Sequence, residues 1–515
     1  MDTPQHIAAA LERVKKRTAK RAADILQSKE IGRADRELLI KTNWLQEIMR
    51  GWYMLVRPDL GADDAVAWYA NFWSFLQIYL KERFGDKYCL SAESSLDLYV
   101  SNSIIPKQVI VVVPQGGSAV YILPHDTSLL VYADSAGFPQ EREVLSGLQV
   151  LPVAVALCKV TNAYFRNKPG DAEVALRLPK NPAELSKTIL KYGYKSAANR
   201  LVGAYEFLGM RDFSSAIQGD LEALGFVVRS ENPLCQKKPL LGNTRIRSPY
   251  AARIEVLWEE SREDVLKVFP RDPGLPKNAA NYLQHVNDVY KEDSYNSLSI
   301  EGYQVTPELI ERVRSKNWNP DLLGGDKDIR NALAARGYYE AFQGVKQTVS
   351  EILKGGEAGV ILEKDLPGWY RKLFLPSVHA GIIEAEHLMG YRNDRVYIRG
   401  SRHVPPPKEA ITDAMDALFN CIKKESSAAV RAILGHYLLV FIHPYMDGNG
   451  RMARFLMNAM LASGGYSWTI ISLKRRAEYM QALKIADENK DLSKLAKFIR
   501  SSMQCKQTTK KTHQS

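Results

Sequence analysis

The sequence predicts a multidomain α+β protein, in which a mixed N-terminal half precedes an all-α C-terminal half that carries a β-hairpin. Its 515 residues exceed what a single compact core usually holds. Runs of β-branched residues are concentrated between residues 96 and 175, and nearly everything beyond residue 250 follows a helical pattern, apart from a hairpin pattern at 396–399. Hydrophobic residues make up 45% of the chain and charged residues 25%, a balance that favours ordered globular domains.

Changes in composition divide the chain into five expected segments. From the N-terminus these are a winged helix-turn-helix-like domain at 1–95, an α+β domain at 96–240, a linker at 241–250, a helical domain at 251–505 and a disordered tail at 506–515. The linker is expected because basic residues alternate there with Pro and Gly, and the tail because it is polar throughout.

The first segment has the order helix, turn, helix, strand, which is typical of a winged helix-turn-helix. Helical patterns at 23–27 and 28–45 precede a strand pattern at 50–56. With a formal net charge of +12, the chain is compatible with a nucleic-acid partner. The residues expected to contact DNA phosphates are Arg33, Arg36, Lys41 and Arg50. The alternative is a winged helix used for protein contacts or dimerisation.

The second segment contains two strand patterns within residues 105–124, on either side of Gly116 and Gly117. Paired glycines between apolar runs predict a β-hairpin at this position. The pattern becomes helical again from about residue 176 to 240.

Several classes of protein are excluded by composition. No run of about 18 apolar residues occurs, so no membrane span is expected, and the N-terminus lacks the apolar core of a secretory signal. The five cysteines are scattered and never spaced as CxxC, which argues against a disulfide framework or a zinc site. These features predict a cytoplasmic protein.

The most informative stretch is 443–454, which has the sequence HPYMDGNGRMAR. Apolar helical patterns at 428–442 and 451–463 flank it, so the stretch is a loop that opens onto the N-terminus of a helix. Such an N-terminus presents unpaired N–H groups and the positive end of a dipole, which together favour an anion. Gly448 and Gly450 let the backbone approach phosphates closely.

Five polar side chains of this loop suit a bound nucleotide. Arg451 and Arg454 are three residues apart, so they share a helix face and can clamp a polyphosphate. Asn449 can donate from its amide to a phosphoryl oxygen. Asp447 is the only carboxylate of the loop and hence the natural ligand for a Mg²⁺ ion that bridges phosphates. His443 would take a proton from an attacking hydroxyl. Together they indicate metal-assisted nucleotidyl or phosphoryl transfer.

The loop resembles the HPFx(D/E)GNGRxxR signature of the Fic family, with Tyr445 in place of the usual Phe at a packing position. The alternative, a solvated Gly-Asn turn between two core helices, does not require His443, Asp447 and both arginines together. The resemblance covers about residues 250 to 500 and implies a Fic domain within the helical segment.

The resemblance also implies roles for the loop residues. The family uses the residue that matches His443 as the general base for a Ser, Thr or Tyr hydroxyl, and the residue that matches Asp447 to hold Mg²⁺. ATP is the co-substrate, AMP is transferred and pyrophosphate is released. A kinase-like branch carries Lys where this chain has Gly450, so phosphorylation of the target is disfavoured.

Residues 296–302, NSLSIEG, resemble the inhibitory [S/T]xxxE[G/N] motif of Fic proteins that carry their own brake. Ser297 and Glu301 are four residues apart and therefore lie on one face of a helix. By analogy with the family, Glu301 pairs with Arg454 and blocks a productive position of the ATP γ-phosphate. The alternative is a helix terminus with an exposed glutamate.

Two further segments resemble parts of Fic domains. Residues 396–401 resemble the flap, a hairpin that holds a target segment across the active site by strand addition. Its expected members are Tyr397, Ile398, Arg399 and Gly400. A plain surface hairpin is the alternative. Residues 474–487 resemble the helix that closes the adenosine pocket, and Tyr479 and Asp487 match positions that contact the nucleoside. His436 is expected to be a hydrogen-bonded core residue.

The sequence thus predicts an autoinhibited protein adenylyltransferase, whose partner is a target protein with a hydroxyl side chain. Two alternatives remain: a DNA-binding transcriptional regulator whose Fic half senses nucleotide, and an enzyme that removes AMP from a modified protein. Because Fic proteins often dimerise, a homodimer is one expectation for the oligomeric state.

Overall fold

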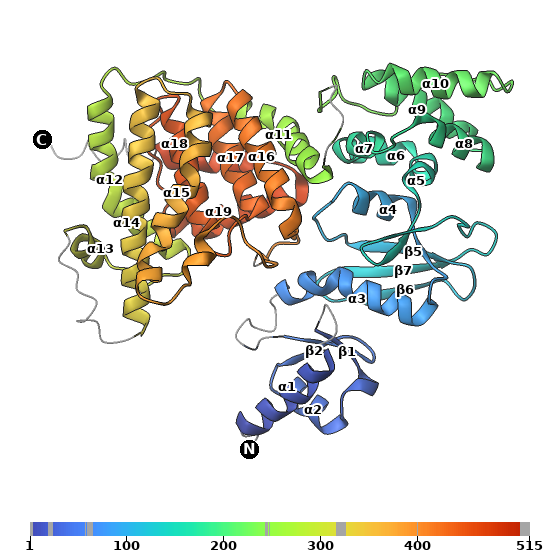
Figure 1. Ribbon diagram of the computed structural model, residues 1–515, viewed down its shortest axis with the longest axis horizontal. Helices are drawn as coiled ribbons and strands as arrows, with labels where there is room; N and C mark the ends of the chain where they lie inside the picture. Colours follow the sequence, from blue (N-terminus) through green and yellow to red (C-terminus); the bar gives the residue numbers. More distant parts are fainter. Residues whose placement is uncertain are drawn as a thin grey trace, which may run out of the picture. The chain divides into compact units, whose positions relative to one another are not determined.

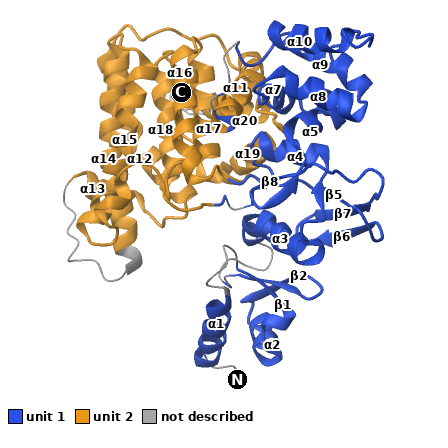
Figure 2. Ribbon diagram, turned by 45° about the vertical axis from the view of Figure 1, so that its right-hand side comes forward, with its two compact units in different colours: residues 1–249, 397–404 blue, residues 250–396, 405–515 orange. Residues whose placement is uncertain are grey.

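The computed structural model describes residues 4–18, 24–56, 58, 65–242, 246, 248–315, 326–398 and 400–504. The chain divides into two compact units, which Figure 2 distinguishes by colour. Unit 1 comprises Met1–Pro249 with Tyr397–Val404, and unit 2 comprises Tyr250–Val396 with Pro405–Ser515. The predicted tail at 506–515 lies outside the described residues.

Unit 1 begins with a small module of helices and a three-stranded antiparallel sheet (Figure 1). Its elements are α1 Pro4–Thr18, β1 Ile25–Gln27, the 3-10 helix η1 Ser28–Glu30, α2 Arg33–Lys41, β2 Leu45–Met49 and β3 Trp52–Leu55. β3 is the central strand. The helix predicted at 23–27 was wrong, because Ile25 and Leu26 are fully buried and pair with β3. The helical propensity of this short segment is overridden by its pairing and burial within a sheet.

The long helix α3, Val66–Phe84, packs against one face of a second sheet. The strands are β4 Cys89–Leu90, β5 Gln108–Val113, β6 Ala119–Leu123 and β7 Thr127–Ala133, in the order β4-β5-β7-β6. Alternate residues of β5 and β7 are buried with the aromatic residues of α3 in a core that also includes Met54 of β3. Segments 1–95 and 96–240 of the sequence therefore share a hydrophobic core.

The hairpin predicted at Gly116 and Gly117 is not formed. β5 pairs with β7 in parallel, and β6 pairs with β7 across a short turn in which His125 and Asp126 have positive φ. The glycines therefore lie in a connection between strands that are not neighbours, and the hairpin occurs one strand later. Paired glycines signal a turn but do not specify which strands pair across it.

The remainder of unit 1 is mostly helical. Its elements are α4 Ala92–Tyr99, β8 Glu143–Leu145, β9 Leu148–Val150, α5 Val153–Lys159, α6 Asn162–Asn167, α7 Pro169–Leu176, α8 Pro182–Tyr192, α9 Lys195–Phe207 and α10 Arg211–Glu222. The buried carboxylate of Glu173 on α7 accepts hydrogen bonds from Arg177 and from the backbone N–H groups of Leu240 and Leu241. The predicted linker at 241–250 therefore begins at a residue that is anchored to α7.

The segment Tyr397–Val404 belongs to unit 1, and its described residues form no hairpin. Instead, its backbone pairs with the stretch before β5: Ile105 N–H donates to the Arg402 carbonyl at 3.0 Å, and Val404 N–H donates to the Ser103 carbonyl at 2.8 Å. The described residues 396–398 are in no strand, and it is residues 402–404 that pair, with a segment about 300 residues earlier. Periodicity within a short segment cannot reveal such a distant partner.

Unit 2 is a helical domain, as the sequence predicts. Its elements are α11 Pro249–Val268, α12 Ala279–Ile300, α13 Pro307–Arg314, α14 Asp326–Leu353, α15 Ala358–His379, η4 Ala385–Leu388, η5 Lys408–Ala410, α16 Ile411–Lys424, α17 Ala428–Ile442, α18 Asn449–Ala462, η6 Leu473–Arg475, α19 Arg476–Asn489 and α20 Ser493–Gln504. α17 is apolar on nearly every side, and almost all residues of α17 and α18 are buried, including the polar side chains of α18. None of the helices in the described ranges is both long enough and apolar enough for a membrane span.

Candidate active site

The site forms where the two central helices of unit 2 meet. α17 ends at Ile442 and is capped by His443, which has a left-handed backbone with φ of 52° and donates its N–H to the Leu439 carbonyl. This conformation costs most residues free energy, so its presence at a half-buried histidine indicates that the surrounding loop enforces it. The chain then turns through Gly448, φ 84°, into α18. A Cβ on Gly448 would lie 2.9 Å from the Phe374 ring, so only glycine fits.

Asn449 holds the loop in shape through both ends of its side-chain amide. Its Oδ1 accepts from Tyr445 N–H at 3.0 Å, and its Nδ2 donates to the Tyr445 carbonyl at 2.8 Å. The sequence suggested a phosphate donor at Asn449, but here the amide is buried inside the loop. The Tyr445 ring stacks on Tyr370, with centroids 3.8 Å apart, so this residue does occupy a packing position.

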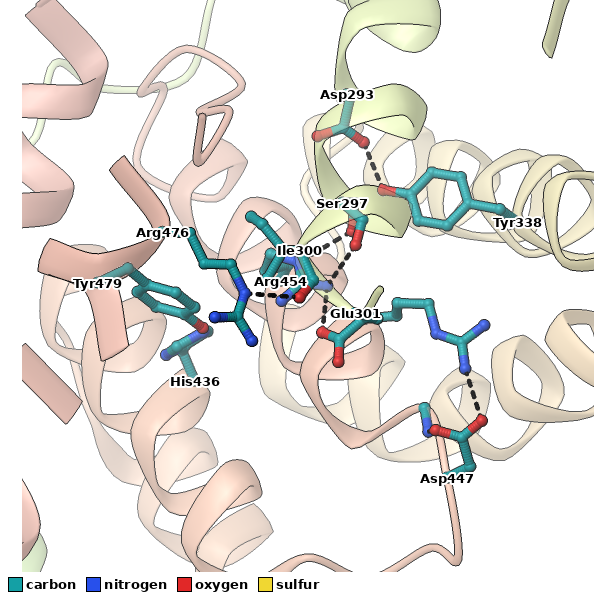
Figure 3. A network of polar contacts seen from close by, with 12 residues as sticks. Asp293, Ser297, Ile300, Glu301, Tyr338, His436, Asp447, Arg454, Arg476 and Tyr479 are labelled. Carbon is teal, nitrogen blue, oxygen red and sulfur yellow. Dashed lines mark hydrogen bonds and ion pairs between the residues drawn. The ribbon is translucent and has the colours of Figure 1, made fainter. Parts of the chain in front are cut away.

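The two arginines of the loop lie on α18 but have different surroundings, and Figure 3 labels Arg454 beside Ser297 and Glu301. Arg451 donates to Oδ2 of Asp447 at 3.1 Å, and its guanidinium lies 5.1 Å from each of the Tyr303 and Phe374 rings. Arg454 points toward α12 instead. It donates to the hydroxyl of Ser297 at 2.9 Å, to the Ser297 carbonyl at 3.0 Å and to Glu301 at 2.6 Å.

The Glu301 carboxylate lies over the N-terminal turn of α18. Besides its ion pair with Arg454, it is so close to the loop that a Cβ added at Gly450 would collide with its Oε1. The first N–H groups of α18 and a guanidinium are the groups that would bind a phosphate. A carboxylate of this chain is therefore in the position where the sequence analysis expected an anionic ligand.

The imidazole of His443 has a defined tautomer. Its Nδ1 lies 3.1 Å from the Val440 carbonyl, which can only accept, so Nδ1 carries the proton and Nε2 of the neutral ring does not. Burial lowers the pKa of His443 below its ordinary value of 6.5, and the nearby Arg392 lowers it further, against the opposing effect of the Val440 hydrogen bond. The ring is therefore a neutral base near pH 7, as general-base catalysis requires.

Arg392 is a site residue that the sequence analysis missed. Its backbone N–H donates to the Pro444 carbonyl at 2.9 Å, and its Nε donates to the His443 carbonyl at 2.7 Å. It also donates to Asp394 and Pro406, and only 5% of it is exposed. Arg392 thus holds the backbone on both sides of the imidazole. It lies fifty residues before the loop in a stretch without periodicity, so no local pattern could have revealed it.

Comparison with known proteins agrees with this geometry. Residues 369–461 match the model of the Fic/DOC family, a range that includes the whole loop. Unit 2 contains a Fic domain.

The chain is also similar to curated proteins of this family. It is 28% identical over 262 residues to the protein adenylyltransferase Fic of Drosophila melanogaster. The aligned region covers 48% of this chain and 46% of that protein. It is 38% identical over 113 residues to the protein of the same name from Drosophila virilis, which covers 21% and 23% respectively. The chain thus matches less than half the length of these relatives.

A solved structure of Fic-1 from C. elegans is similar at 17% sequence identity and a TM-score of 0.36. The match covers 64% of this chain and 89% of that structure.

The helix α19 of unit 2 brings Tyr479 against His436 of α17. The Tyr479 hydroxyl lies 2.8 Å from Nε2 of His436, and both side chains are buried. Burial lowers the pKa of His436 to about 3, so this histidine is a neutral core residue, as expected from the sequence. Asp487, two turns further along α19, is half-buried and interacts with the hydroxyl of Tyr437.

The remaining predicted residues are elsewhere. Tyr397, Ile398 and Gly400 belong to unit 1, and Arg399 lies outside the described residues. Arg33, Arg36 and Lys41 lie on α2, and Arg50 lies in the turn between β2 and β3.

Asp447 fits a magnesium ion only when that ion is also bound to phosphate. Its side chain is 61% exposed, with Oδ1 accepting from Gly448 N–H at 2.6 Å. The described part of the chain holds no cluster of three or more His, Cys, Asp or Glu side chains that could bind a metal by itself. One exposed carboxylate next to groups that could bind a phosphate suits Mg²⁺. This ion typically takes one or two carboxylates and completes its coordination shell with phosphates and water.

Proposed function

We propose that this chain is a protein adenylyltransferase, which transfers AMP from ATP to a Ser, Thr or Tyr hydroxyl of a target protein. The observation that carries the proposal is the combination, on one loop, of a neutral imidazole with an unprotonated Nε2 and an anion site at a helix N-terminus. The Fic domain and the adenylyltransferase relatives support the same reaction class.

The reaction needs one group that accepts a proton and a set of donors that stabilise the negative charge of the phosphates. The target hydroxyl oxygen attacks the α-phosphorus of ATP, the bond from that phosphorus to the bridging oxygen of the β-phosphate breaks, and pyrophosphate leaves. Nε2 of His443 takes the hydroxyl proton. The N–H groups at the start of α18 and the Arg454 guanidinium would stabilise the negative charge of the phosphates. Mg²⁺ held by Asp447 would neutralise part of that charge.

Glu301 is proposed as the brake on this reaction. Its carboxylate pairs with Arg454 at 2.6 Å and lies over Gly450, so it competes with a nucleotide phosphate for the same cradle. Glu301 is also the residue at the C-terminal end of α12, where the helix dipole disfavours a negative charge. The carboxylate is therefore stabilised mainly by Arg454 and α18, and a more highly charged phosphate can displace it.

Intact-mass spectrometry tests this proposal. After incubation of the protein and Mg²⁺ with ATP, CTP, GTP or UTP in separate reactions, we expect self-modification by one or more AMP groups with ATP. A gain of phosphate alone would instead assign a kinase. Loss of AMP from a previously modified protein, without any gain from ATP, would assign the reverse, AMP-removing reaction.

The cytoplasm is the proposed compartment, because the described cysteines are free thiols.

DNA binding by the N-terminal module is proposed as an additional activity. One observation favours it: α2 is followed directly by the antiparallel β2–β3 pair, the order in which a recognition helix precedes a wing, although β1 and the 3-10 helix η1 separate α1 from α2. α2 would then be the recognition helix and the β2–β3 turn the wing. Arg33 and Lys41 on α2 and Arg50 in the turn are exposed, whereas Arg36 is half-buried near the Tyr53 ring. Arg33 forms an exposed i,i+4 pair with Glu37, which water screens.

Salt dependence distinguishes DNA contact from a protein-binding role for this module. We expect duplex DNA to bind with an affinity that falls linearly with salt on a double-logarithmic plot. The Arg33→Ala/Arg50→Ala variant should reduce that slope by roughly two, since each lost phosphate contact contributes about 0.9. Lys187→Ala, an exposed lysine on α8, is the control and should leave the slope unchanged. Fluorescence anisotropy measures the affinity for duplex DNA at each salt concentration. Absence of binding at every salt concentration would exclude this activity.

A further inference from the structure

The last turn of α12, which is capped by the proposed brake Glu301, is held by a second helix as well as by Arg454. Arg476 is the first residue of α19, and its Nε donates to the Ile300 carbonyl at 2.9 Å (Figure 3). Ile300 is the last residue of α12 and comes directly before Glu301. The end of the brake helix is therefore joined to the start of α19.

Asn296, one turn before the end of α12, makes a second contact with the same segment. Its Oδ1 accepts from the backbone N–H of Leu473 at 2.8 Å, and its Nδ2 donates to the Glu292 carbonyl at 2.8 Å. Asn296 is buried, so both ends of its amide are paired away from solvent, where an unpaired group would be costly. Residues 473–476 therefore hold the last turn of α12 at two points.

The peptide unit between Ile300 and Glu301 is fixed at both ends. Its N–H, which belongs to Glu301, donates to the Leu298 carbonyl at 3.1 Å, and its carbonyl accepts from Arg476. Because a peptide unit is planar, these two contacts set the direction in which the chain enters Glu301. The chain then turns at Gly302, which has φ of 89°. The position of the Glu301 side chain therefore depends in part on Arg476.

Arg476 also supplies the charge that this helix end favours. The last carbonyls of an α-helix have no partner within the helix and form the negative end of its dipole. α12 has no basic residue in its own last turn, so a guanidinium from α19 provides both a donor and a positive charge there. The dipole opposes the negative charge of Glu301, and Arg476 offsets part of that effect.

We propose that Arg476 is a positioning residue for the brake, which holds the Ile300 carbonyl and thereby keeps the Glu301 carboxylate over the N-terminus of α18. This inference rests on the proposed adenylyltransferase function. Arg476 acts through the backbone of α12 and not through the loop that carries His443. When its contact is lost, the end of α12 is less constrained, and the phosphate site is open in a larger fraction of molecules.

Arg476→Ala should raise kcat/KM for ATP by about three- to tenfold, the effect of losing one hydrogen bond at an exposed side chain. The measurement is the rate of label incorporation from ATP at concentrations below KM. Arg476→Lys keeps a positively charged donor and should have a smaller effect. Asn296→Ala removes the second contact with residues 473–476 and should also raise kcat/KM. Arg271→Ala changes an exposed arginine between α11 and α12 and should match the unmodified protein.

The Glu301→Gly background separates a role in the brake from a direct role in nucleotide binding. Without Glu301, Arg476→Ala should change kcat/KM by less than about twofold, because the two substitutions act through the same carboxylate. Thermal unfolding of each variant reports the structural cost separately.

Three results would overturn the inference while the proposed function stands. The first is an unchanged kcat/KM in Arg476→Ala although Glu301→Gly is faster. The second is an equal rise with and without Glu301. The third is a fall in kcat/KM in the Glu301→Gly background, which would assign Arg476 to the nucleotide itself. If the Glu301→Gly protein transfers no AMP at all, the proposed function fails, and this inference fails with it.

Discussion

Replacing Glu301 by glycine is expected to raise the rate of AMP transfer by roughly ten- to a hundredfold. The change removes the carboxylate that pairs with Arg454 and lies over Gly450, and so empties the anion cradle. Hydrogen bonds to charged groups contribute about 1.5–3 kcal/mol, and each 1.4 kcal/mol is a factor of ten in the population that can accept ATP. The α12 helix should tolerate glycine here, because Glu301 already terminates it.

The measurement is the initial rate of label incorporation from ATP, compared across three variants. Glu301→Gln keeps a neutral hydrogen-bonding group toward Arg454 and should give an intermediate rate. Glu311→Ala changes an exposed glutamate on α13 and should match the unmodified protein. If Glu301→Gly transfers no faster than Glu311→Ala, Glu301 does not act as a brake.

His443→Asn is expected to lower the transfer rate of the Glu301→Gly protein by about a hundred- to ten-thousandfold, the usual contribution of a general base. Asparagine is the informative substitution at this position. It tolerates the left-handed backbone of residue 443, and its amide can still donate to the Val440 carbonyl. It has no group that accepts a proton near neutral pH, so loss of rate reports loss of the base.

Two comparisons make this result specific. His387→Ala, at an exposed histidine in η4, should leave the rate unchanged. ATP binding by His443→Asn should persist, since the proposed phosphate site is formed by the N-terminus of α18 and Arg454. A His443→Asn protein that transfers AMP at the parental rate would remove the imidazole from the mechanism.

The pH dependence of the Glu301→Gly rate provides a second check on the same residue. Only the neutral imidazole is a base, and burial lowers its pKa below 6.5. The rate should therefore stay constant on going down from pH 8 to about 6.5 and fall only at more acid pH. The loss of Glu301, whose charge raises the pKa of His443, should shift this fall further toward acid.

The chemistry of the loop could be predicted from the sequence because its residues are contiguous. His443, Asp447 and Arg454 lie within twelve residues, and the geometry of a loop before a helix follows from local rules. Arg392 could not be predicted in this way, since it reaches the site from a distant segment through tertiary packing. Asn449 was given a ligand-binding role from its residue type, whereas its amide is used by the backbone of the loop.

The fold could be predicted best where a hydrophobic pattern extends over a long segment of the chain. The segments that form α17 and α18 have long apolar patterns and are almost entirely buried. Both helices therefore lie close to the ranges that the sequence predicts. The errors concern short segments whose partners are remote in sequence. Residues 25–27 form a strand because β3 pairs with them, and residues 402–404, just after the expected hairpin, pair with 103–105.

The central claim is that the loop beginning at His443 directs a hydroxyl to the α-phosphorus of ATP. Incubating Glu301→Gly protein with Mg²⁺ and ATP labelled on either the α- or the γ-phosphate tests it most directly. Label from the α-phosphate should remain on protein, and label from the γ-phosphate should leave as pyrophosphate. Protein that retains the γ-label, or neither label, would contradict the claim.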